Sequence, residues 1–224
     1  MTTVAAIPLP VDSIFSPERI DPRAAGRLTS ASQRQRLLYG VTSCVAERGF
    51  APTTIEAITT RAGVSKKTFY EHFPNKLACF LAAYEVGVEA LVSTVAKAAA
   101  EAAASGADAR ARLRAALRAG LAFLFIEQLY ARMFFIEILA LGPEAVRDRT
   151  RCHDALIRTV RAWHDQARAQ HPDWPAVPDG AYAAAIAATH ELVTTLVATD
   201  RTQELPELED TLMYVHQSLL HVPA

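Results

Sequence analysis

The sequence predicts an all-α protein in two parts, an N-terminal set of short helices and a C-terminal helical bundle. Alanine and leucine dominate from residue 77 onward, and alternating runs of β-branched residues are scarce, which disfavours a sheet. Apolar residues recur instead at the three- and four-residue spacing of a helix face. The chain of 224 residues is 51% hydrophobic and 21% charged. It can therefore bury a sizeable core as one or two domains.

Residues 1–32 are predicted to be a mobile arm, because they contain four prolines, few aromatic residues and no helical period. The arm carries Arg19, Arg23 and Arg27. Two interpretations stay open for it. The arginines reach a nucleic-acid groove, as basic arms do on some DNA-binding domains, or the arm is a tail without such a contact.

The first helical period covers residues 33–48. Leu37, Val41 and Val45 share one face of it, and Gly49 can adopt the left-handed conformation that ends a helix. Gly40 lies inside this helix. We expect it to weaken the helix by up to about 1 kcal/mol relative to alanine.

Two short helices joined by a glycine turn are predicted next. The capping box Thr53-x-x-Glu56 marks the start of the first, which stops at Gly63. Ser65 is a good N-cap for the second, over residues 66–73. Two short helices so joined are typical of a helix-turn-helix, whose second helix enters the major groove of DNA. Spacing alone is a weak signal for this motif.

Capping residues, glycines and prolines divide the remainder into longer helices. Asn75 can cap a helix over residues 76–103. Further helices are expected over residues 108–128, 129–141, 143–170, 179–199 and 205–222. We assign residues 33–85 to a three-helix domain with the helix-turn-helix and residues 86–224 to a helical bundle.

The formal charge is segregated along the chain. Residues 1–80 hold ten Lys and Arg against six Asp and Glu, a balance of +4, and the remainder holds thirteen against eighteen, a balance of −5. A basic N-terminal part suits a polyanion such as nucleic acid. The acidic remainder does not favour one.

Cysteine usage and hydropathy favour the cytoplasm. Cys44, Cys79 and Cys152 are odd in number and widely spaced, so we interpret them as packing residues rather than a disulfide framework. No Lys or Arg precedes Arg19, and we expect no signal peptide. Charges recur within residues 121–141, the most apolar later segment, so we expect neither a membrane span nor a membrane partner.

The residues around the turn form a longer string. Its parts are Thr53-Thr54-Ile55-Glu56-Ala57-Ile58, then Ala62-Gly63-Val64-Ser65-Lys66-Lys67-Thr68-Phe69-Tyr70-Glu71-His72-Phe73, then Asn75-Lys76. This string resembles the N-terminal domain of the tetracycline-repressor (TetR) family over about residues 33–85. Small, apolar, aromatic and basic residues agree with the family in order and spacing. Gly40, Thr59 and Lys67 depart from the family pattern without putting the fold in doubt.

The resemblance and the residue types predict a DNA-binding surface. Lys66, Lys67 and Thr68 at the start of the second short helix are expected to touch base edges or phosphates. Phe69 and Phe73, four residues apart, are expected to be buried. The resemblance implies phosphate contacts for Tyr70, His72 and Lys76, and for Thr53 and Thr54. The complete predicted set is Thr53, Thr54, Ser65, Lys66, Lys67, Thr68, Tyr70, His72 and Lys76.

The resemblance further implies that the C-terminal part forms a homodimer and binds a small molecule. Two apolar stripes at helical spacing suit a four-helix interface between subunits, although packing within one subunit is the alternative. The interface candidates are Tyr182, Ile186, Val193, Leu208, Leu212, Val215 and Leu219. A small apolar or aromatic effector is expected near the aromatic-rich segment 123–137. The candidates for its site are Phe123, Glu127, Phe134, Glu137, His153 and His190.

We therefore expect a cytoplasmic, nucleoid-associated DNA-binding regulator that a small molecule releases from a palindromic operator, with no cofactor and no metal. One alternative keeps the DNA-binding domain but has a protein partner, or no ligand, as the signal. Another class is a helical metal-dependent enzyme, in which Glu127, Glu137, His153 and His190 would be ligands. The chain has no Glu-x-x-His, His-x-x-x-His or cysteine pair that favours such a site.

Overall fold

The computed structural model describes residues 30–222, and over this range it contains helices and no strand. The elements are α1 (Ser30–Arg48), α2 (Ile55–Ala62), α3 (Lys66–His72), α4 (Lys76–Ala104), α5 (Ala109–Ile126), α6 (Gln128–Phe135), η2 (Glu137–Ala140), α7 (Pro143–Gln170), α8 (Asp179–Ala198), η3 (Thr202–Leu208) and α9 (Glu209–Leu220). The all-α prediction is confirmed. The predicted arm, with Arg19, Arg23 and Arg27, lies almost entirely outside the described residues.

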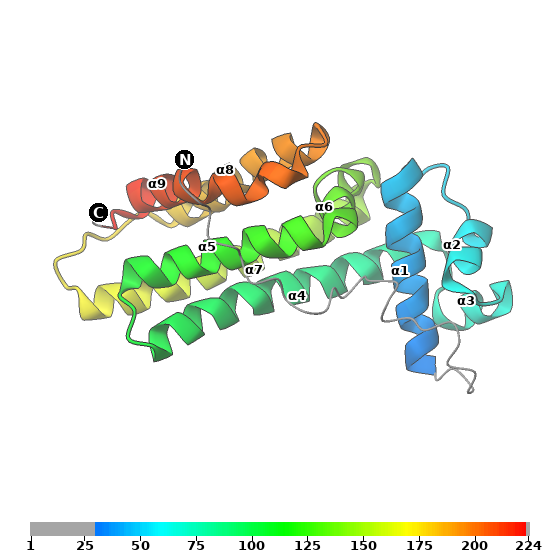
Figure 1. Cartoon of the computed structure of the whole chain (residues 1–224), viewed down its shortest axis with the longest axis horizontal. Helices are drawn as coiled ribbons and strands as arrows, with labels where there is room; N and C mark the ends of the chain where they lie inside the picture. The colour runs from blue at the N-terminus through cyan, green and yellow to red at the C-terminus, as the bar shows by residue number, and fades with distance from the viewer. Residues whose placement is uncertain (1–29, 223–224) are drawn as a thin grey trace.

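The N-terminal domain forms one end of an elongated molecule (Figure 1). Helix α1 packs against α2, α3, α4 and α6. Its buried Leu37, Val41 and Val45 meet Ile58 of α2 and Phe69 of α3 in a core that continues into the C-terminal bundle. Burial of these apolar side chains is the main force that holds the short helices in place.

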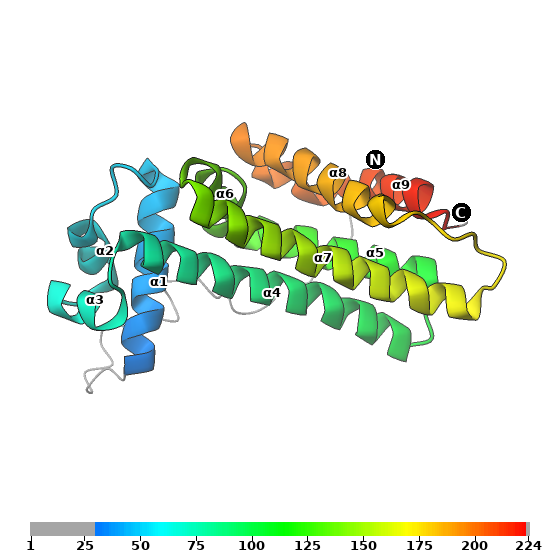
Figure 2. The same ribbon diagram turned by 180° about the vertical axis from the view of Figure 1, so that it is seen from behind.

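Helix α4 joins the two parts of the molecule without a break. It begins beside α1 and α3 and runs along the bundle to the opposite end (Figures 1 and 2). The predicted boundary between residues 85 and 86 falls inside this 29-residue helix. The two domains therefore share a helix, and a displacement of α4 moves the C-terminal end of the N-terminal domain with it.

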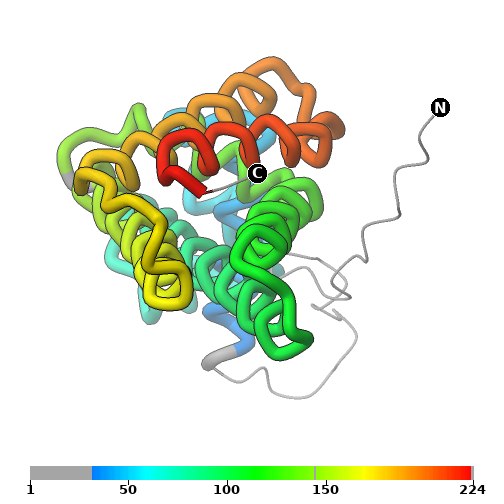
Figure 3. The backbone as a smooth tube through the Cα atoms, turned by 90° about the vertical axis from the view of Figure 1, so that its left-hand side faces the viewer, coloured from blue at the N-terminus to red at the C-terminus, as the bar shows by residue number. Residues whose placement is uncertain are grey.

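The C-terminal bundle places α8 and α9 across α5 and α7. The end-on view shows α7, α4 and α5 side by side, with α8 and α9 covering them (Figure 3). Packing between α4 and α5, α5 and α9, and α7 and α8 agrees with this arrangement. The helices thus surround an interior that is lined by α4 to α9.

Two predicted helices begin or break differently from expectation. The expected helix over 129–141 divides at Ile136 into α6 and the short 3-10 helix η2. The expected helix over 205–222 is η3 followed by α9, because Pro206 lies inside η3 and cannot donate an α-helical hydrogen bond. Residues three apart share a face in both forms of helix, so the apolar spacing over these short segments did not reveal the breaks.

Hydropathy alone would admit membrane helices in this chain. Within the described residues, α4 and α8 are long and apolar enough to cross a membrane, and α5 with the segment 128–140 passes as a pair bent by 101°. In the structure each of these helices buries one face against the bundle. Helix α4 exposes Glu85, Glu89 and Glu101 on another face, a pattern typical of bundle packing in water.

Candidate nucleic-acid interface and internal cavity

The second short helix, α3, is fixed by caps at its start. The Ser65 hydroxyl accepts a hydrogen bond from the Thr68 amide at 3.0 Å. Gly63 takes the left-handed conformation, with φ of 63°, in the turn between α2 and α3, where a residue with a side chain would be strained. The helix-turn-helix geometry expected from this turn is present.

The outer face of α3 carries the predicted reading residues. Phe69 is fully buried and Phe73 nearly so, as expected, so their burial turns the rest of α3 outward. Ser65, Lys66, Lys67 and Tyr70 are exposed, and Thr68 is half-buried. Tyr70 is 57% exposed, so its ring and hydroxyl are accessible to a partner.

Lys66 forms an exposed ion pair with Glu56 of α2, with 3.1 Å between Nζ and Oε2. Such a pair contributes little to stability, because water screens both charges. The amine can therefore exchange its partner for a phosphate at small cost. Thr54, which caps α2 by accepting a hydrogen bond from the Ala57 amide at 3.1 Å, is exposed, and His72 is half-buried.

Thr53 does not have the predicted role. It is 1% exposed, and its hydroxyl lies 2.7 Å from the Gly49 carbonyl and 3.2 Å from the Cys44 carbonyl. The N-cap of α2 is Thr54, and the expected capping box that begins at Thr53 is wrong by one residue. Because its hydroxyl satisfies the end of α1, Thr53 is a structural residue and not a DNA contact.

The side-chain amine of Lys76 also forms its hydrogen bonds within the protein. Its amine donates to the carbonyl oxygens of Phe50 at 2.6 Å, Thr53 at 2.7 Å and Ala51 at 3.2 Å. It also lies 4.2 Å from the centre of the Phe50 ring. Burial lowers the pKa of this amine. The geometry assigns Lys76 to closing the loop between α1 and α2, which corrects its expected role as a phosphate contact.

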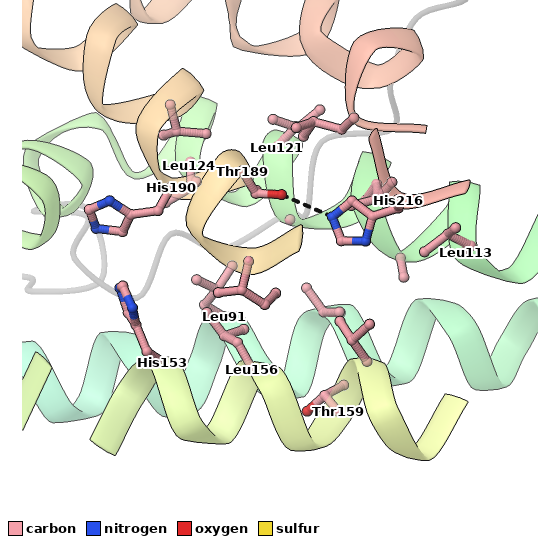
Figure 4. A pocket seen from close by; sticks show the side chains of 18 of the residues that line it. Leu91, Leu113, Leu121, Leu124, His153, Leu156, Thr159, Thr189, His190 and His216 are labelled. Carbon is pink, nitrogen blue, oxygen red and sulfur yellow. Dashed lines mark hydrogen bonds between the residues drawn. The ribbon is translucent and has the colours of Figure 1, made fainter. Parts of the chain in front are cut away.

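The bundle encloses a cavity of about 120 Å³ between α4 and α9. Its walls are mainly leucine, valine and phenylalanine side chains, among them Leu91, Leu121, Leu124 and Leu156 (Figure 4). The polar side chains on the wall are three histidines and two threonines. No Lys, Arg, Asp or Glu of the described chain lines the cavity.

Three of the six predicted ligand residues line this cavity: Phe134, His153 and His190. The other three do not. Phe123 packs edge-on against Tyr130 at 6.1 Å between ring centres, and Glu127 lies at the bend between α5 and α6. Glu137 faces the N-terminal domain instead, so these three predictions are corrected.

Sequence reasoning missed most of the wall, including Thr189 and His216. The buried face of α9 consists of Leu212, Met213, His216 and Leu220. The apolar stripe predicted from the sequence, which includes Val215 and Leu219, lies about one residue away from this buried face. A polar residue at the i+4 position from Leu212 was the available signal.

The histidines at the wall are held in the neutral form. Burial lowers the pKa of His216 to about 4. Burial, together with the nearby His153 and Arg149, lowers the pKa of His190 to about 4. His153 and His190 lie together, with 4.8 Å between ring centres, at the end of the cavity opposite His216 (Figure 4).

Glu137 connects the bundle to the N-terminal domain. Its carboxylate accepts a hydrogen bond from the Phe50 amide at 2.9 Å. Glu137 follows α6, whose Phe134 and Phe135 line the cavity. Phe50 is also the residue whose carbonyl is held by Lys76. A continuous set of contacts therefore runs from the cavity wall to the loop between α1 and α2.

The predicted dimer stripe belongs largely to the subunit interior. Tyr182, Ile186, Val193 and Leu212 are buried within one subunit, and the last three line the cavity. These four are corrected from interface to core residues. Leu208, Val215 and Leu219 are half-buried. The outward face of α8 carries Ala183, Ala184 and Ala187, and that of α9 carries Tyr214, which is 73% exposed.

Residues 42–83 match the family of bacterial regulatory proteins described as the tetR family. The HTH-type transcriptional activator FasR of Mycolicibacterium smegmatis is 35% identical over 69 residues, which are 31% of this chain and 32% of that protein. The uncharacterized HTH-type regulator YerO of Bacillus subtilis is 40% identical over 53 residues, 24% of this chain and 18% of its own length. The match thus spans a third or less of these curated relatives.

Solved structures resemble the whole described fold. The fatty acid degradation regulator FadR from Bacillus halodurans has a TM-score of 0.74 at 18% identity, covering 85% of this chain and 95% of its own. FadR from Bacillus subtilis, solved in complex with stearoyl-CoA, has a TM-score of 0.72 at 16% identity and covers 84% of this chain and 98% of its own. At these identities the likeness concerns the fold.

Proposed function

We propose that the chain is a member of the tetR family of bacterial regulatory proteins and acts as a DNA-binding transcriptional regulator that a small molecule releases from its operator. The observation that carries the proposal is the exposed, capped helix α3, which the continuous helix α4 links to an apolar cavity. Such an arrangement gives a reading surface and a sensing site that share a rigid element.

The DNA-binding surface is formed by the outer face of α3 and the start of α2. Lys67 and Thr68 would meet base edges, which their position near the exposed N-terminal end of α3 supports. Ser65, Lys66, Tyr70 and His72, with Thr54 of α2, would meet the phosphates. Thr53 and Lys76 support this surface from inside.

The regulator is proposed to act as a homodimer, because a palindromic operator needs two reading helices at the spacing of successive major grooves. The outward faces of α8 and α9 would meet their copies in the partner subunit. Alanines at 183, 184 and 187 permit close helix approach, and Tyr214, Val215 and Leu219 supply apolar area. A protein of this kind works in the cytoplasm, where it finds the chromosome.

The effector is proposed to enter the cavity at the centre of the bundle. The apolar wall favours an apolar or aromatic molecule. That a structural relative, FadR of Bacillus subtilis, was solved with stearoyl-CoA supports ligand binding in this fold. Repression is the proposed sign of regulation, although the relative FasR is named an activator.

The coupling between cavity and DNA would pass through α6 and Glu137. A ligand that displaces Phe134 or Phe135 also displaces the carboxylate that holds the Phe50 amide. It would also act on α4, because Tyr84 of α4 stacks on Phe134 at 4.9 Å between ring centres. The ligand then favours subunit positions in which the two α3 helices no longer match the DNA.

Two other readings make different demands on the molecule. A regulator whose signal is a protein partner would leave the cavity without a ligand. A metal-dependent enzyme would need several ligand side chains in one place, but within the described residues no cluster of three His, Cys, Asp or Glu is close enough to hold an ion. Glu137 in particular is turned away from His153 and His190.

Selection from a randomised DNA library tests the proposed reading role. The full-length protein should enrich a site with two inverted half-sites. Lys67→Ala and Thr68→Ala should each change the preferred base at a symmetric pair of positions, at about 1–3 kcal/mol per good contact. An identical preferred site for both variants would show that these side chains contact only the backbone, and no enrichment by the wild type would overturn the function.

A further inference from the structure

The hydrogen bonds of His216 fix which of its ring nitrogens carries the proton. Thr189 Oγ1 lies 2.9 Å from the Ala185 carbonyl oxygen and 2.9 Å from His216 Nε2. A carbonyl oxygen only accepts, so the single hydroxyl hydrogen must point to Ala185. Otherwise two acceptors would face each other at 2.9 Å. Nε2 therefore donates to Thr189, and Nδ1 of the neutral ring is an acceptor.

The same reasoning applies to His190. Thr194 Oγ1 lies 2.7 Å from the His190 carbonyl oxygen, which takes the hydroxyl hydrogen, and 3.2 Å from His190 Nδ1. Nδ1 therefore donates to Thr194, and Nε2 is left as an acceptor. The two rings are protonated on different nitrogens, yet each leaves its other nitrogen as an acceptor.

Both remaining nitrogens are buried without a protein hydrogen-bond partner. Among the described residues, neither His216 Nδ1 nor His190 Nε2 has one, and both side chains line the cavity. His216 is 1% exposed. A buried polar atom left unpaired costs free energy. Figure 4 shows the second nitrogen of His216 turned away from Thr189.

The other polar groups of the wall, Thr159 and His153, add no charge. The Thr159 hydroxyl is committed as a donor to the Ala155 carbonyl at 3.0 Å. No hydrogen bond within residues 30–222 fixes the tautomer of His153, so this ring can present either a donor or an acceptor. The wall carries no Lys or Arg, and burial keeps His216 and His190 neutral.

Resting on the proposed effector site, we propose that the cavity selects an uncharged, apolar ligand that carries a hydroxyl or N–H donor, which it gives to His216 Nδ1 or His190 Nε2. A carboxylate or phosphate would enter an apolar space with no Lys or Arg on its wall, at a large desolvation cost. An ether or hydrocarbon of equal size would fill the space and leave the acceptors unpaired. The cavity therefore selects a ligand by its hydrogen-bond donor as well as by its shape.

Two isomers provide a direct test. Benzyl alcohol and anisole have the same formula and similar size, but only the alcohol has a hydrogen-bond donor. Calorimetric titration of the full chain without DNA should give benzyl alcohol an affinity five- to tenfold above that of anisole, the range of one net hydrogen bond. Benzoate should bind more weakly than both. Equal affinity for the isomers, or tighter binding of benzoate, would overturn the proposal.

Variants at His216 and His190 test whether these two residues cause the preference for benzyl alcohol over anisole. His216→Leu with His190→Leu removes both acceptors and should bring the ratio of the two affinities below twofold. His216→Asn, which keeps an oxygen near the Nδ1 position, should retain more of the preference than His216→Leu. A ratio unchanged in the double variant would overturn the assignment.

Histidine ¹⁵N spectra of the unliganded wild type test the tautomers without any substitution. They should show Nε2–H at His216 and Nδ1–H at His190, and the opposite tautomers would overturn the proposal. DNA affinity measured with and without benzyl alcohol separates the two proposals. Preferential binding of the alcohol with unchanged DNA affinity would refute the effector role and leave the ligand class standing.

Discussion

Lys76 illustrates how neighbours decide the role of a side chain. The resemblance to the TetR family assigned it to a DNA phosphate. In the structure three backbone carbonyls surround its amine. These carbonyls come from a loop more than twenty residues earlier, which no local pattern reveals. Thr53 was misassigned for the same reason, since its hydroxyl closes the same loop.

Replacing Lys76 by methionine should lower the free energy of unfolding by about 1–3 kcal/mol, because it leaves the carbonyls of Phe50 and Thr53 with fewer partners. Lys67→Met, on the exposed face of α3, should change stability by less than about 0.5 kcal/mol. Urea unfolding of both variants measures the difference. Salt titrations should show that Lys67→Met weakens DNA binding, whereas equal stability of the two variants would contradict the assignment of Lys76.

The buried histidines predict a dependence of stability on pH. The pKa of His216 is about 4 in the folded protein and about 6.5 when exposed. The unfolded state therefore binds more protons between these values, and stability falls as pH falls from 6.5 toward 4. From pH 6.5 to 4.5 His216 alone should contribute a loss of about 2 kcal/mol.

Glu47, Glu204 and Glu209 have lowered pKa values, because arginines bond to each of them. Their contribution is lost only below about 4.5, their ordinary pKa, so the window above it isolates the histidines. Thermal or urea unfolding at pH 4.5, 5.5 and 6.5 would measure the slope, and His216→Leu should reduce it. A wild-type stability that is flat across this window would contradict the buried neutral histidine.

At the scale of elements, caps and periods predicted where most helices begin and end. Ser65, Asn75 and Asp108 accept hydrogen bonds from the helix starts that they cap. The faces of helices were harder to predict. On α8 and α9 small and apolar residues cover much of the surface, so the sequence could not tell which apolar stripe is buried in the subunit. Packing against α5 and α7 decides that, and it buries Val193 and Leu212.

Gly40 marks a close contact between helices, and the expectation that alanine would be better there is wrong. A Cβ at this position would lie 2.8 Å from the Ile58 carbonyl oxygen of α2, a backbone atom that cannot step aside alone. Gly40→Ala should therefore destabilise by about 1–3 kcal/mol. Gly180→Ala on α8, where no atom lies within 4 Å of a new Cβ, should stabilise by up to about 1 kcal/mol. Melting curves of both would decide, and a stabilised Gly40→Ala would contradict the packing.

An arginine substitution should have different effects on the outward face and on the buried face of α8 and α9. Ala187→Arg, on the outward face, should yield folded monomers, because the charge enters a desolvated interface between subunits and costs several kcal/mol. Leu212→Arg, at the cavity wall, should instead unfold or aggregate the chain. Sedimentation velocity and circular dichroism on both proteins separate the outcomes. A dimeric Ala187→Arg would place the interface elsewhere.

At the scale of the whole molecule, the fold class and the DNA-binding motif were predictable, whereas the cavity and its connection to the motif were not. The motif is local, with its residues between 53 and 76. The cavity gathers side chains from six helices between residues 91 and 216. The bond between Glu137 and the Phe50 amide joins residues 87 positions apart. Such partners are fixed by tertiary packing, which a single sequence does not display.

Glu137→Ala should weaken the coupling between the cavity and DNA without preventing either binding event. The variant loses the acceptor for the Phe50 amide but leaves α3 and the cavity wall in place. The ratio of DNA affinities without and with ligand should fall by a factor of about three to ten, a loss of about 1 kcal/mol of coupling. Glu101→Ala, exposed at the far end of α4, is the control. An unchanged ratio in Glu137→Ala would remove this residue from the coupling.

The measurement that tests the central claim most directly is a DNA-binding titration of the wild-type protein on its selected operator, with and without a saturating ligand of the cavity. We expect one dimer to bind the two inverted half-sites, and the ligand to weaken this binding at least tenfold while binding to unrelated DNA changes little. Operator affinity that stays the same when calorimetry shows the cavity to be filled would contradict the account.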